Sequence, residues 1–215
     1  MPTIDFLWDL LFPPKCPFCG RILERSGDLL CPDCQRELPW LTGPEGEKAV
    51  DFTTGCVAPL RYQDRVRDAV CAYKFGGKSA RSRALGALVA QCVSDHGGSA
   101  DLISWPPLSR KRLRQRGYDQ ARLLAEEVGK ALGLPVEATL TKREVPAQSG
   151  LTEEAERRAN VRGAYAALDP ERVRDKRVLL VDDVVTSGST LSECACILRL
   201  AGASEVSCAV LARAR

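Results

Sequence analysis

Histidine is the scarcest catalytic residue type in this sequence, since His96 is the only one among 215 residues. It stands in Ser94-Asp95-His96-Gly97-Gly98, a pattern typical of a helix end followed by a glycine turn. A Ser-His-Asp or Cys-His nucleophile needs a histidine as its base. Because the neighbours of His96 do not suggest that role, the sequence argues against hydrolases of this kind.

Long apolar runs and an export signal are also missing. No stretch approaches the roughly 18 apolar residues that indicate a membrane span. The first twelve residues carry Asp5 and Asp9 but no basic side chain, unlike the start of a secretory signal. They instead predict a short amphipathic helix, with apolar residues at helical spacing: Ile4, Leu7, Trp8 and Leu11. We therefore expect a cytoplasmic protein with no membrane span.

The formal net charge of +3 is unevenly distributed. Residues 1–55 hold 5 basic and 9 acidic side chains, a net −4, which leaves 26 basic and 19 acidic side chains, a net +7, for residues 56–215. Arginine dominates the basic part and suits planar recognition of phosphate or carboxylate. A polyanionic ligand is therefore expected on the larger part of the chain.

Four of the ten cysteines form two CxxC pairs, Cys16/Cys19 and Cys31/Cys34. Two such pairs can direct four thiolates at one tetrahedral zinc ion. A redox CxxC motif is the alternative, but it does not need a second copy nearby. We predict a structural Zn²⁺ that stabilises a ribbon too small to fold alone. The remaining cysteines are expected as small buried apolar residues: Cys56, Cys71, Cys92, Cys194, Cys196 and Cys208.

The rest of the chain alternates between strand and helix patterns, which predicts an α/β fold with a parallel sheet covered on both faces. Strands are expected at residues 56–62, 101–105, 136–140, 177–181 and 205–212. Helices are expected at residues 65–74, 80–93, 118–132, 153–161 and 191–201. A linker at residues 41–51, rich in Gly and Pro, divides the chain. The N-terminal helix and zinc ribbon then occupy residues 1–50, and the α/β domain residues 51–215.

The most specific motif follows the apolar strand at residues 178–181. Asp182 and Asp183 come first, and then a loop opens a helix with Thr186, Ser187, Gly188, Ser189 and Thr190. Ligands of parallel sheets bind at the carboxyl ends of the strands, and such a loop offers N–H groups and hydroxyls to a phosphate. The two acids suit vicinal ribose hydroxyls, or Mg²⁺ beside them. The motif therefore predicts a site for a phosphorylated ribose.

An acid pair after a strand also occurs in Walker B motifs, which need a Walker A loop elsewhere in the chain. Gly76-Gly77-Lys78-Ser79 ends like such a loop, but Ala72 stands where its first glycine belongs. We therefore reject the nucleotide-triphosphatase interpretation.

Residues 178–190 resemble the phosphoribosyl-pyrophosphate (PRPP) signature of type I phosphoribosyltransferases. Together with the four-cysteine ribbon, they make the chain similar to the ComF family. Further matching segments are Phe12-Pro13-Pro14-Lys15-Cys16, Tyr73-Lys74-Phe75-Gly76-Gly77, Arg116-Gly117-Tyr118-Asp119-Gln120, Gln148, Arg157 with Asn160, and Gly202-Ala203. The resemblance implies a phosphoribosyltransferase-like sheet flanked by helices, with PRPP and Mg²⁺ as ligands. It makes Asp182 and Asp183 the catalytic residues and places PRPP on them and on the loop of residues 186–190.

The same resemblance implies a pyrophosphate loop and a hood over the site. The pyrophosphate loop falls on Pro107, Leu108, Ser109 and Arg110, and the hood lies between Thr141 and Asn160. This chain departs from the family pattern in two places. Asp119 stands where the family usually has Asn, and Ser104-Trp105-Pro106-Pro107 replaces a common Val-Pro-Val-Pro run.

A run of basic residues follows the expected pyrophosphate loop: Arg110, Lys111, Arg112, Arg114 and Arg116. Charge runs are usually solvated faces. Beside a pyrophosphate loop, we expect Arg112, Arg114 and Arg116 to contact a ligand, with pyrophosphate favoured over the backbone of single-stranded DNA.

Two functional hypotheses follow from these patterns. In the first, the protein is a phosphoribosyltransferase that moves the ribosyl group of PRPP to an acceptor that the sequence does not identify. In the second, the same fold senses PRPP or binds single-stranded DNA without turnover. The ComF resemblance implies a role in natural competence, in which incoming single-stranded DNA and competence or recombination proteins are the partners.

Overall fold

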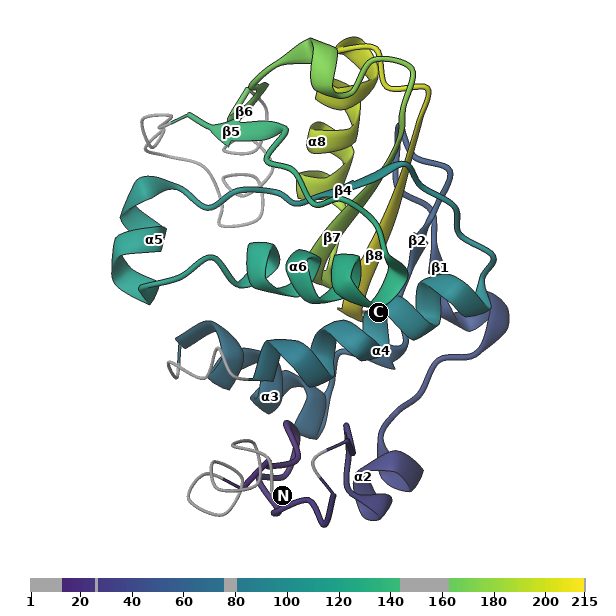
Figure 1. The fold of residues 1–215 in the computed structure, drawn as a ribbon, viewed down its shortest axis with the longest axis vertical. Coiled ribbons are helices and arrows are strands. Elements are labelled where there is room, and N and C mark those ends of the chain that lie inside the picture. Colours follow the sequence, from purple (N-terminus) through teal and green to yellow (C-terminus); the bar gives the residue numbers. More distant parts are fainter. Residues whose placement is uncertain (1–12, 26, 76–80, 144–162, 215) are drawn as a thin grey trace, which may run out of the picture.

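The computed structural model describes residues 13–25, 27–75, 81–143 and 163–214 (Figure 1). Several features considered from the sequence lie outside these residues. They are the N-terminal helix at residues 4–11, the Gly-Gly-Lys-Ser segment at 76–79, the helix at 153–161, most of the hood, and the family matches at Gln148, Arg157 and Asn160. Within the described part of the chain, no helix is both long and apolar enough to span a bilayer.

The main sheet has six strands and is mostly parallel, as predicted. Its path runs β1 (Glu47–Lys48), β2 (Cys56–Val57), β8 (Glu205–Arg213), β7 (Arg177–Val185) and β4 (Leu102–Ser104), and β3 (Leu60–Arg61) also pairs with β8. Only β1 pairs in the antiparallel direction among these described strands.

The strand predicted at residues 56–62 is interrupted. Cys56 pairs with Cys208 and Leu60 with Ala212, so β2 and β3 follow β8 in one register. Pro59 lies between them and has no N–H to donate to a ladder. Ala58 donates its N–H to the carbonyl of Gly46 instead, at 2.9 Å. The proline therefore divides one line of pairing into two short strands.

Helices cover both faces of the sheet. On one face lie α3 (Asp64–Phe75), α4 (Ser82–Asp95) and α6 (Gln120–Leu132), and on the other lies α8 (Ser189–Leu200) (Figure 1). Side chains alternate along β7 as a strand requires. Leu179 and Val181 belong to the core with α4 and α6, whereas Val178 and Leu180 belong to the core with α8.

Two local predictions are wrong. The strand predicted at residues 136–140 is only a single bridge from Val136 to Ile103. The true strand β5 (Leu140–Lys142) pairs with β6 (Tyr165–Ala167) in a separate antiparallel sheet. The expected linker at 41–51 contains a short 3-10 helix, η1 (Gly43–Gly46), and strand β1. The sequence assigned no secondary structure to the basic run, which forms helix α5 (Arg110–Arg116) and so includes Arg110, the last residue of the expected pyrophosphate loop.

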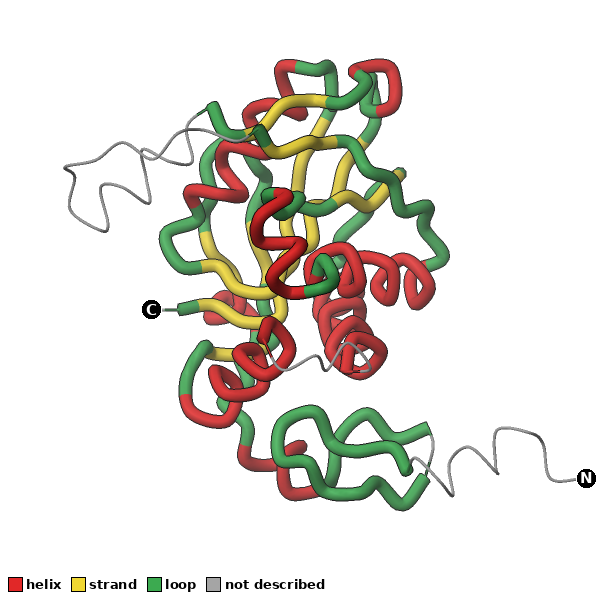
Figure 2. Tube along the Cα trace, turned by 90° about the vertical axis from the view of Figure 1, so that its left-hand side faces the viewer, coloured by secondary structure: helices red, strands yellow, loops and turns green. Residues whose placement is uncertain are grey.

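The ribbon lies beside α3 and ends in α2 (Pro32–Glu37) (Figure 2). Phe18 and Leu23 of the ribbon belong to the same apolar core as Val66 of α3. Trp40 forms an antiparallel bridge with Leu60, which continues the chain from α2 into the sheet. The ribbon is therefore packed onto the α/β part through apolar side chains as well as through the connection.

The lone histidine and the scattered cysteines largely follow their predictions. His96 caps the C-terminus of α4, where its Nδ1 lies 2.8 Å from the carbonyl oxygen of Cys92. Most of the scattered cysteines are buried, but Cys71 is exposed and Cys196 is only half-buried. The expectation of burial was therefore wrong for Cys71.

Candidate functional site

Four thiols meet in the ribbon, as the two CxxC pairs predicted. The Sγ atoms of Cys16, Cys19, Cys31 and Cys34 all lie within 4.8 Å of one another. Zinc–sulfur bonds of about 2.3 Å in a tetrahedron place sulfur atoms about 3.8 Å apart. The cluster therefore fits one Zn²⁺. The Sγ atoms of Cys19 and Cys31 lie 3.5 Å apart, so they need to move only slightly to reach the tetrahedral spacing.

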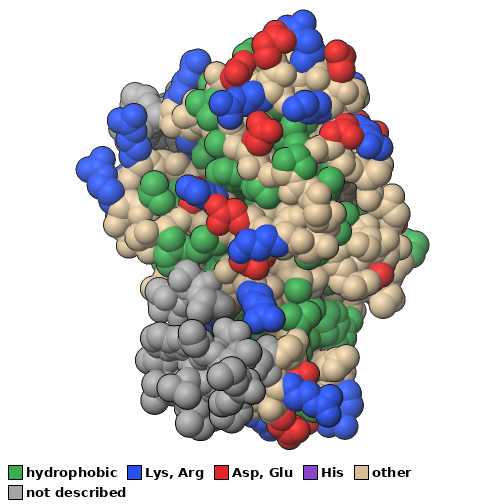
Figure 3. Space-filling view, viewed as in Figure 1, with side chains coloured by type: hydrophobic (Ala, Val, Ile, Leu, Met, Phe, Trp, Pro, Cys, Tyr) green, Lys and Arg blue, Asp and Glu red, His purple; other side chains and the backbone are tan. Residues whose placement is uncertain are grey.

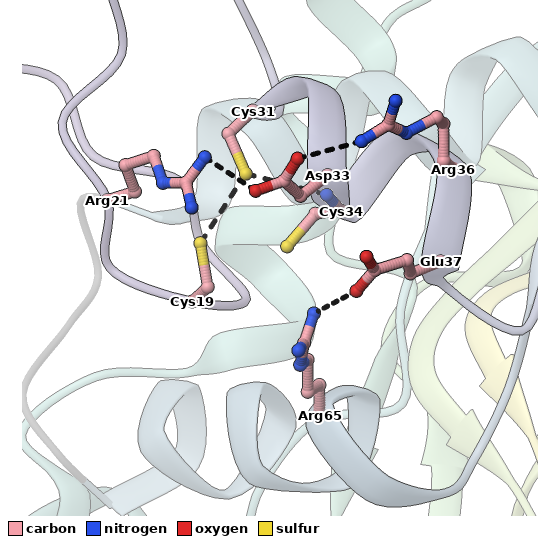
Figure 4. Close-up of polar contacts among 8 residues, drawn as sticks. All are labelled: Cys19, Arg21, Cys31, Asp33, Cys34, Arg36, Glu37 and Arg65. Carbon is pink, nitrogen blue, oxygen red and sulfur yellow. Dashed lines mark hydrogen bonds and ion pairs between the residues drawn. The ribbon is translucent and has the colours of Figure 1, made fainter.

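Arginine–carboxylate pairs surround the thiols (Figure 4). Arg21 lies 2.6 Å from Asp33, and Arg65 of α3 lies 2.9 Å from Glu37 of α2. A zinc ion with four thiolates carries a net charge of −2, which nearby guanidinium groups complement. Burial raises the pKa of the Cys16 thiol, but backbone hydrogen bonds outweigh it and bring that pKa to about 7. This thiol is therefore partly prepared to act as a thiolate ligand.

The acid pair lies within β7, near its carboxyl end. Consecutive residues of a strand project to opposite faces, so Asp182 and Asp183 have different surroundings. Asp183 is only 3% exposed, and its Oδ1 lies 2.7 Å from the Nζ of Lys74, on the last turn of α3. Burial, followed by the charge of Asp183, raises the pKa of Asp182 to about 7, although Lys74 opposes the shift.

The loop after β7 leads directly into the N-terminus of α8. Gly188 is the N-cap of α8 and adopts a φ of +85°. The hydroxyls of Ser187 and Ser189 lie 2.7 Å apart. A hollow of about 50 Å³ lies against the loop, and its polar and glycine lining is Asp182, Thr186, Ser187, Gly188, Ser189 and Thr190. The structure therefore brings together the residues that the sequence grouped at this loop and the first acid.

Sequence reasoning missed the support beneath this loop. A Cβ atom on Gly188 would lie 3.3 Å from Cγ2 of Val50. Val50 belongs to the segment predicted as a linker, and it is buried in the core that contains α8. Its role depends on tertiary packing, so no local sequence pattern indicated it.

The expected pyrophosphate segment connects β4 to α5. The backbone N–H of Leu108 donates to Asp119 at 3.3 Å, and Ser109 caps α5 by accepting from the N–H of Arg112. Asp119 also accepts from the N–H of Arg122 at the start of α6, and its burial raises its pKa. Asp119 therefore ties this segment to α6, a role that its position as a helix N-cap could have indicated.

Helix α5 presents its basic residues outward, and within this described helix no residue is buried. Lys and Arg side chains project along the left-hand edge of the molecule, where α5 lies (Figure 3). Arg116 is partly engaged, because its guanidinium carbon lies 4.8 Å from the centre of the Phe75 ring. The structure thus makes Arg112 and Arg114 more accessible than Arg116.

A further cation, Lys142 of β5, was not singled out by the sequence. Its Nζ lies 2.8 Å from the hydroxyl of Tyr165, which sits on the paired strand β6. Burial and then the charge of Arg112 lower the pKa of Lys142, while Asp182 acts in the opposite direction. The β5–β6 pair therefore holds a cation within the field of both Asp182 and α5. Strand β5 overlaps the start of the predicted hood, and most of that hood lies outside the described residues.

Family models match two parts of the chain. The phosphoribosyl transferase domain matches residues 119–215, and the double zinc ribbon domain matches residues 7–48. These matches agree with the fold and with the four-cysteine cluster.

Several relatives align over most of their length. Competence protein F of Haemophilus influenzae is 29% identical, over 93% of this chain and 97% of that protein. Competence protein ComFC of Streptococcus pneumoniae is 26% identical, over 89% and 84% of the two chains. The DNA utilization protein YhgH of Salmonella typhimurium is 30% identical, over 89% and 80%. With a zinc ribbon ahead of a phosphoribosyltransferase domain and these full-length relatives, the chain belongs to the ComF family.

Proposed function

We propose that this protein binds PRPP at the carboxyl end of β7. The observation that carries the proposal is the passage from β7 through a glycine and hydroxyl loop into the N-terminus of α8. The free N–H groups and positive end of α8 suit the 5′-phosphate. We assign the two acids just before the loop to the sugar, where Asp182 and Asp183 would accept hydrogen bonds from the ribose hydroxyls.

The remaining parts of PRPP fit neighbouring segments. The segment of Pro107, Leu108, Ser109 and Arg110 leaves β4, the strand next to β7, and we assign it to pyrophosphate. Mg²⁺ prefers carboxylate and phosphate oxygens, so Asp182 is the better candidate ligand. Asp183 already has an ammonium group at 2.7 Å, which makes it a poor ligand for a divalent cation.

The favoured activity is transfer of the ribosyl group with loss of pyrophosphate. Asp182 and Asp183 would then act as catalytic residues that favour positive charge on the sugar in the transition state. The acceptor is not identified by any described residue. PRPP sensing without turnover is the second candidate, and the pairing of Lys74 with Asp183 favours it, because the pair reduces the negative charge beside the sugar.

We also propose a nucleic-acid contact at α5 as part of a cytoplasmic role in competence. The relatives are named for competence and for DNA utilization. The exposed side chains of Arg112 and Arg114 could follow the phosphates of single-stranded DNA, with Arg116 at the edge of the surface. Competence or recombination proteins would be the partners in that setting.

Calorimetric titration of the zinc-loaded protein with PRPP, with and without Mg²⁺, tests the ligand assignment. We expect saturable binding that Mg²⁺ strengthens. Absence of binding at millimolar PRPP would contradict the proposal. Release of pyrophosphate with a panel of acceptors then separates the enzyme from the sensor.

A further inference from the structure

Lys74 forms an ion pair with Asp183, although it comes from helix α3, a different part of the fold. We propose that Lys74 is a positioning residue for ribose recognition: it holds one oxygen of Asp183 and leaves the other for a ribose hydroxyl. The inference rests on the proposed function and adds a role for α3, which the acid and loop motifs do not include.

The position of Lys74 is set by hydrogen bonds between helices. Tyr73, its buried neighbour on α3, donates its hydroxyl to the carbonyl of Gln120 at 2.8 Å. Tyr118 donates in return to the backbone carbonyl of Tyr73. These two bonds join the last turn of α3 to the start of α6. Lys74 therefore extends towards β7 from a fixed backbone, and a cation in the last turn also suits the helix dipole.

The two oxygens of Asp183 differ in their surroundings. Oδ1 lies 2.7 Å from the ammonium of Lys74, whose side chain is 22% exposed. Oδ2 is buried and has no hydrogen-bond partner among the described residues. A buried acceptor without a donor is costly, and such an atom marks a partner that the described residues do not supply. If the neighbouring loop binds the 5′-phosphate of the ligand, a ribose hydroxyl of the same ligand would be the donor to this oxygen.

The ion pair also fixes the orientation of the carboxylate. A carboxylate can rotate between equivalent hydrogen-bonding arrangements, and a charged partner on Oδ1 selects one of them. Oδ2 is covered in this conformation, so side chains around the end of β7 must shift when a hydroxyl reaches it. The ion pair keeps the acceptor in place during that shift.

The comparison of ribose 5-phosphate with inorganic phosphate isolates this role, because only the former carries the hydroxyls. Both ligands are titrated by calorimetry, without Mg²⁺, into wild type, Lys74→Met, Lys74→Arg, Asp183→Asn and the Lys74→Met/Asp183→Asn double variant. Lys130→Met is the matched control, since Lys130 pairs with Glu127 at 2.6 Å on the exposed side of α6. Chemical denaturation establishes that each variant is folded. The double variant keeps the test usable if Lys74→Met alone leaves a buried charge that prevents folding.

Wild type should bind ribose 5-phosphate more tightly than inorganic phosphate. That preference should fall about tenfold in Asp183→Asn, in Lys74→Met and equally in the double variant, as expected for one charge-assisted hydrogen bond. Lys74→Arg should keep most of the preference, Lys130→Met all of it, and the affinity for inorganic phosphate should stay unchanged throughout.

Two results overturn the inference while leaving the proposed function in place. One is an unchanged preference in folded Lys74→Met, or in the double variant if Lys74→Met does not fold. The other is a double variant that loses the product of the two single losses, because Lys74 would then act independently of Asp183. A wild type that shows no preference for ribose 5-phosphate refutes both the inference and the assignment of the acids to ribose.

Discussion

Gly188, in the loop proposed to bind phosphate, is a position where a side chain is costly. Its φ of +85° lies in the left-handed region, where an L-residue costs about 1–2 kcal/mol. A Cβ atom would also lie 3.3 Å from Cγ2 of Val50, which requires a shift of a few tenths of an ångström. Overpacking that forces neighbours to shift costs about 1 kcal/mol or more. We therefore expect Gly188→Ala to lower the free energy of unfolding by about 2–3 kcal/mol.

Gly133→Ala is the matched control for this substitution. Gly133 ends α6 with a φ of +67°, and nothing lies within 4 Å of an added Cβ. It should show the conformational cost without the contact with Val50 and without an effect on ligands. Urea denaturation of both variants measures the difference in the free energy of unfolding. Calorimetry with inorganic phosphate and PRPP measures the difference in ligand affinity. The reasoning is refuted if Gly188→Ala matches wild type in stability and binds phosphate with wild-type affinity.

Three further predictions concern other parts of the molecule. Cys31→Ser should remove one of four zinc ligands, so metal analysis should show loss of zinc and limited proteolysis should cut the ribbon first. A fully zinc-loaded variant would contradict the zinc site. Arg112→Ala/Arg114→Ala/Arg116→Ala should weaken binding of single-stranded DNA and flatten its dependence on salt, because each lost phosphate contact removes a counterion-release step; an unchanged slope would make α5 a solvated face. Because the pKa of Asp182 is raised to about 7, the folded state retains a proton that the unfolded state loses near pH 4, so stability should fall as pH rises from about 4 to 7. Asp182→Asn should flatten that fall in urea denaturation, and equal slopes for variant and wild type would show that Asp182 does not titrate in this way.

The main sheet was predictable because its central strands carry an unambiguous apolar signal. Residues 178–181 are apolar throughout, as a parallel strand buried on both faces must be. Strand β8 occurs where its pattern placed it, whereas β7 continues beyond the predicted end at residue 181, through both acids, to Val185. The break between β2 and β3 also had a signal, since Pro59 cannot donate a ladder hydrogen bond. The alternation along β7 could likewise have separated the two acids.

The sequence of α5 contains capping and helix-forming residues in addition to its run of charge. Ser109 is a good N-cap, and the Arg, Lys, Leu and Gln residues that follow are good helix formers. The repulsion among the basic side chains is offset by capping at both ends, with Gly117 at φ +80° ending the helix. Considering the segment only as a charge run therefore hid its secondary structure.

The partners of the candidate site were not predictable from local patterns. Lys74, which pairs with Asp183, lies more than a hundred positions earlier in the chain. Val50, which packs against Gly188, comes from the edge of the sheet. Strands β5 and β6 are three residues each, too short to show a reliable period. Contacts of these kinds depend on how helices and loops dock, which the order of residues along one element does not specify.

In the proposed site, Asp182 and Asp183 bind the ribose of PRPP, and the loop of residues 186–190 binds its 5′-phosphate. Calorimetry on two folded variants tests this assignment most directly. Asp182→Asn/Asp183→Asn should weaken binding of PRPP far more than binding of inorganic phosphate, because it removes the acceptors of the sugar and spares the loop. Gly188→Val should abolish binding of both ligands, because a branched side chain enters the cradle at a left-handed φ. If both variants bind PRPP like wild type, the assignment of this site is wrong.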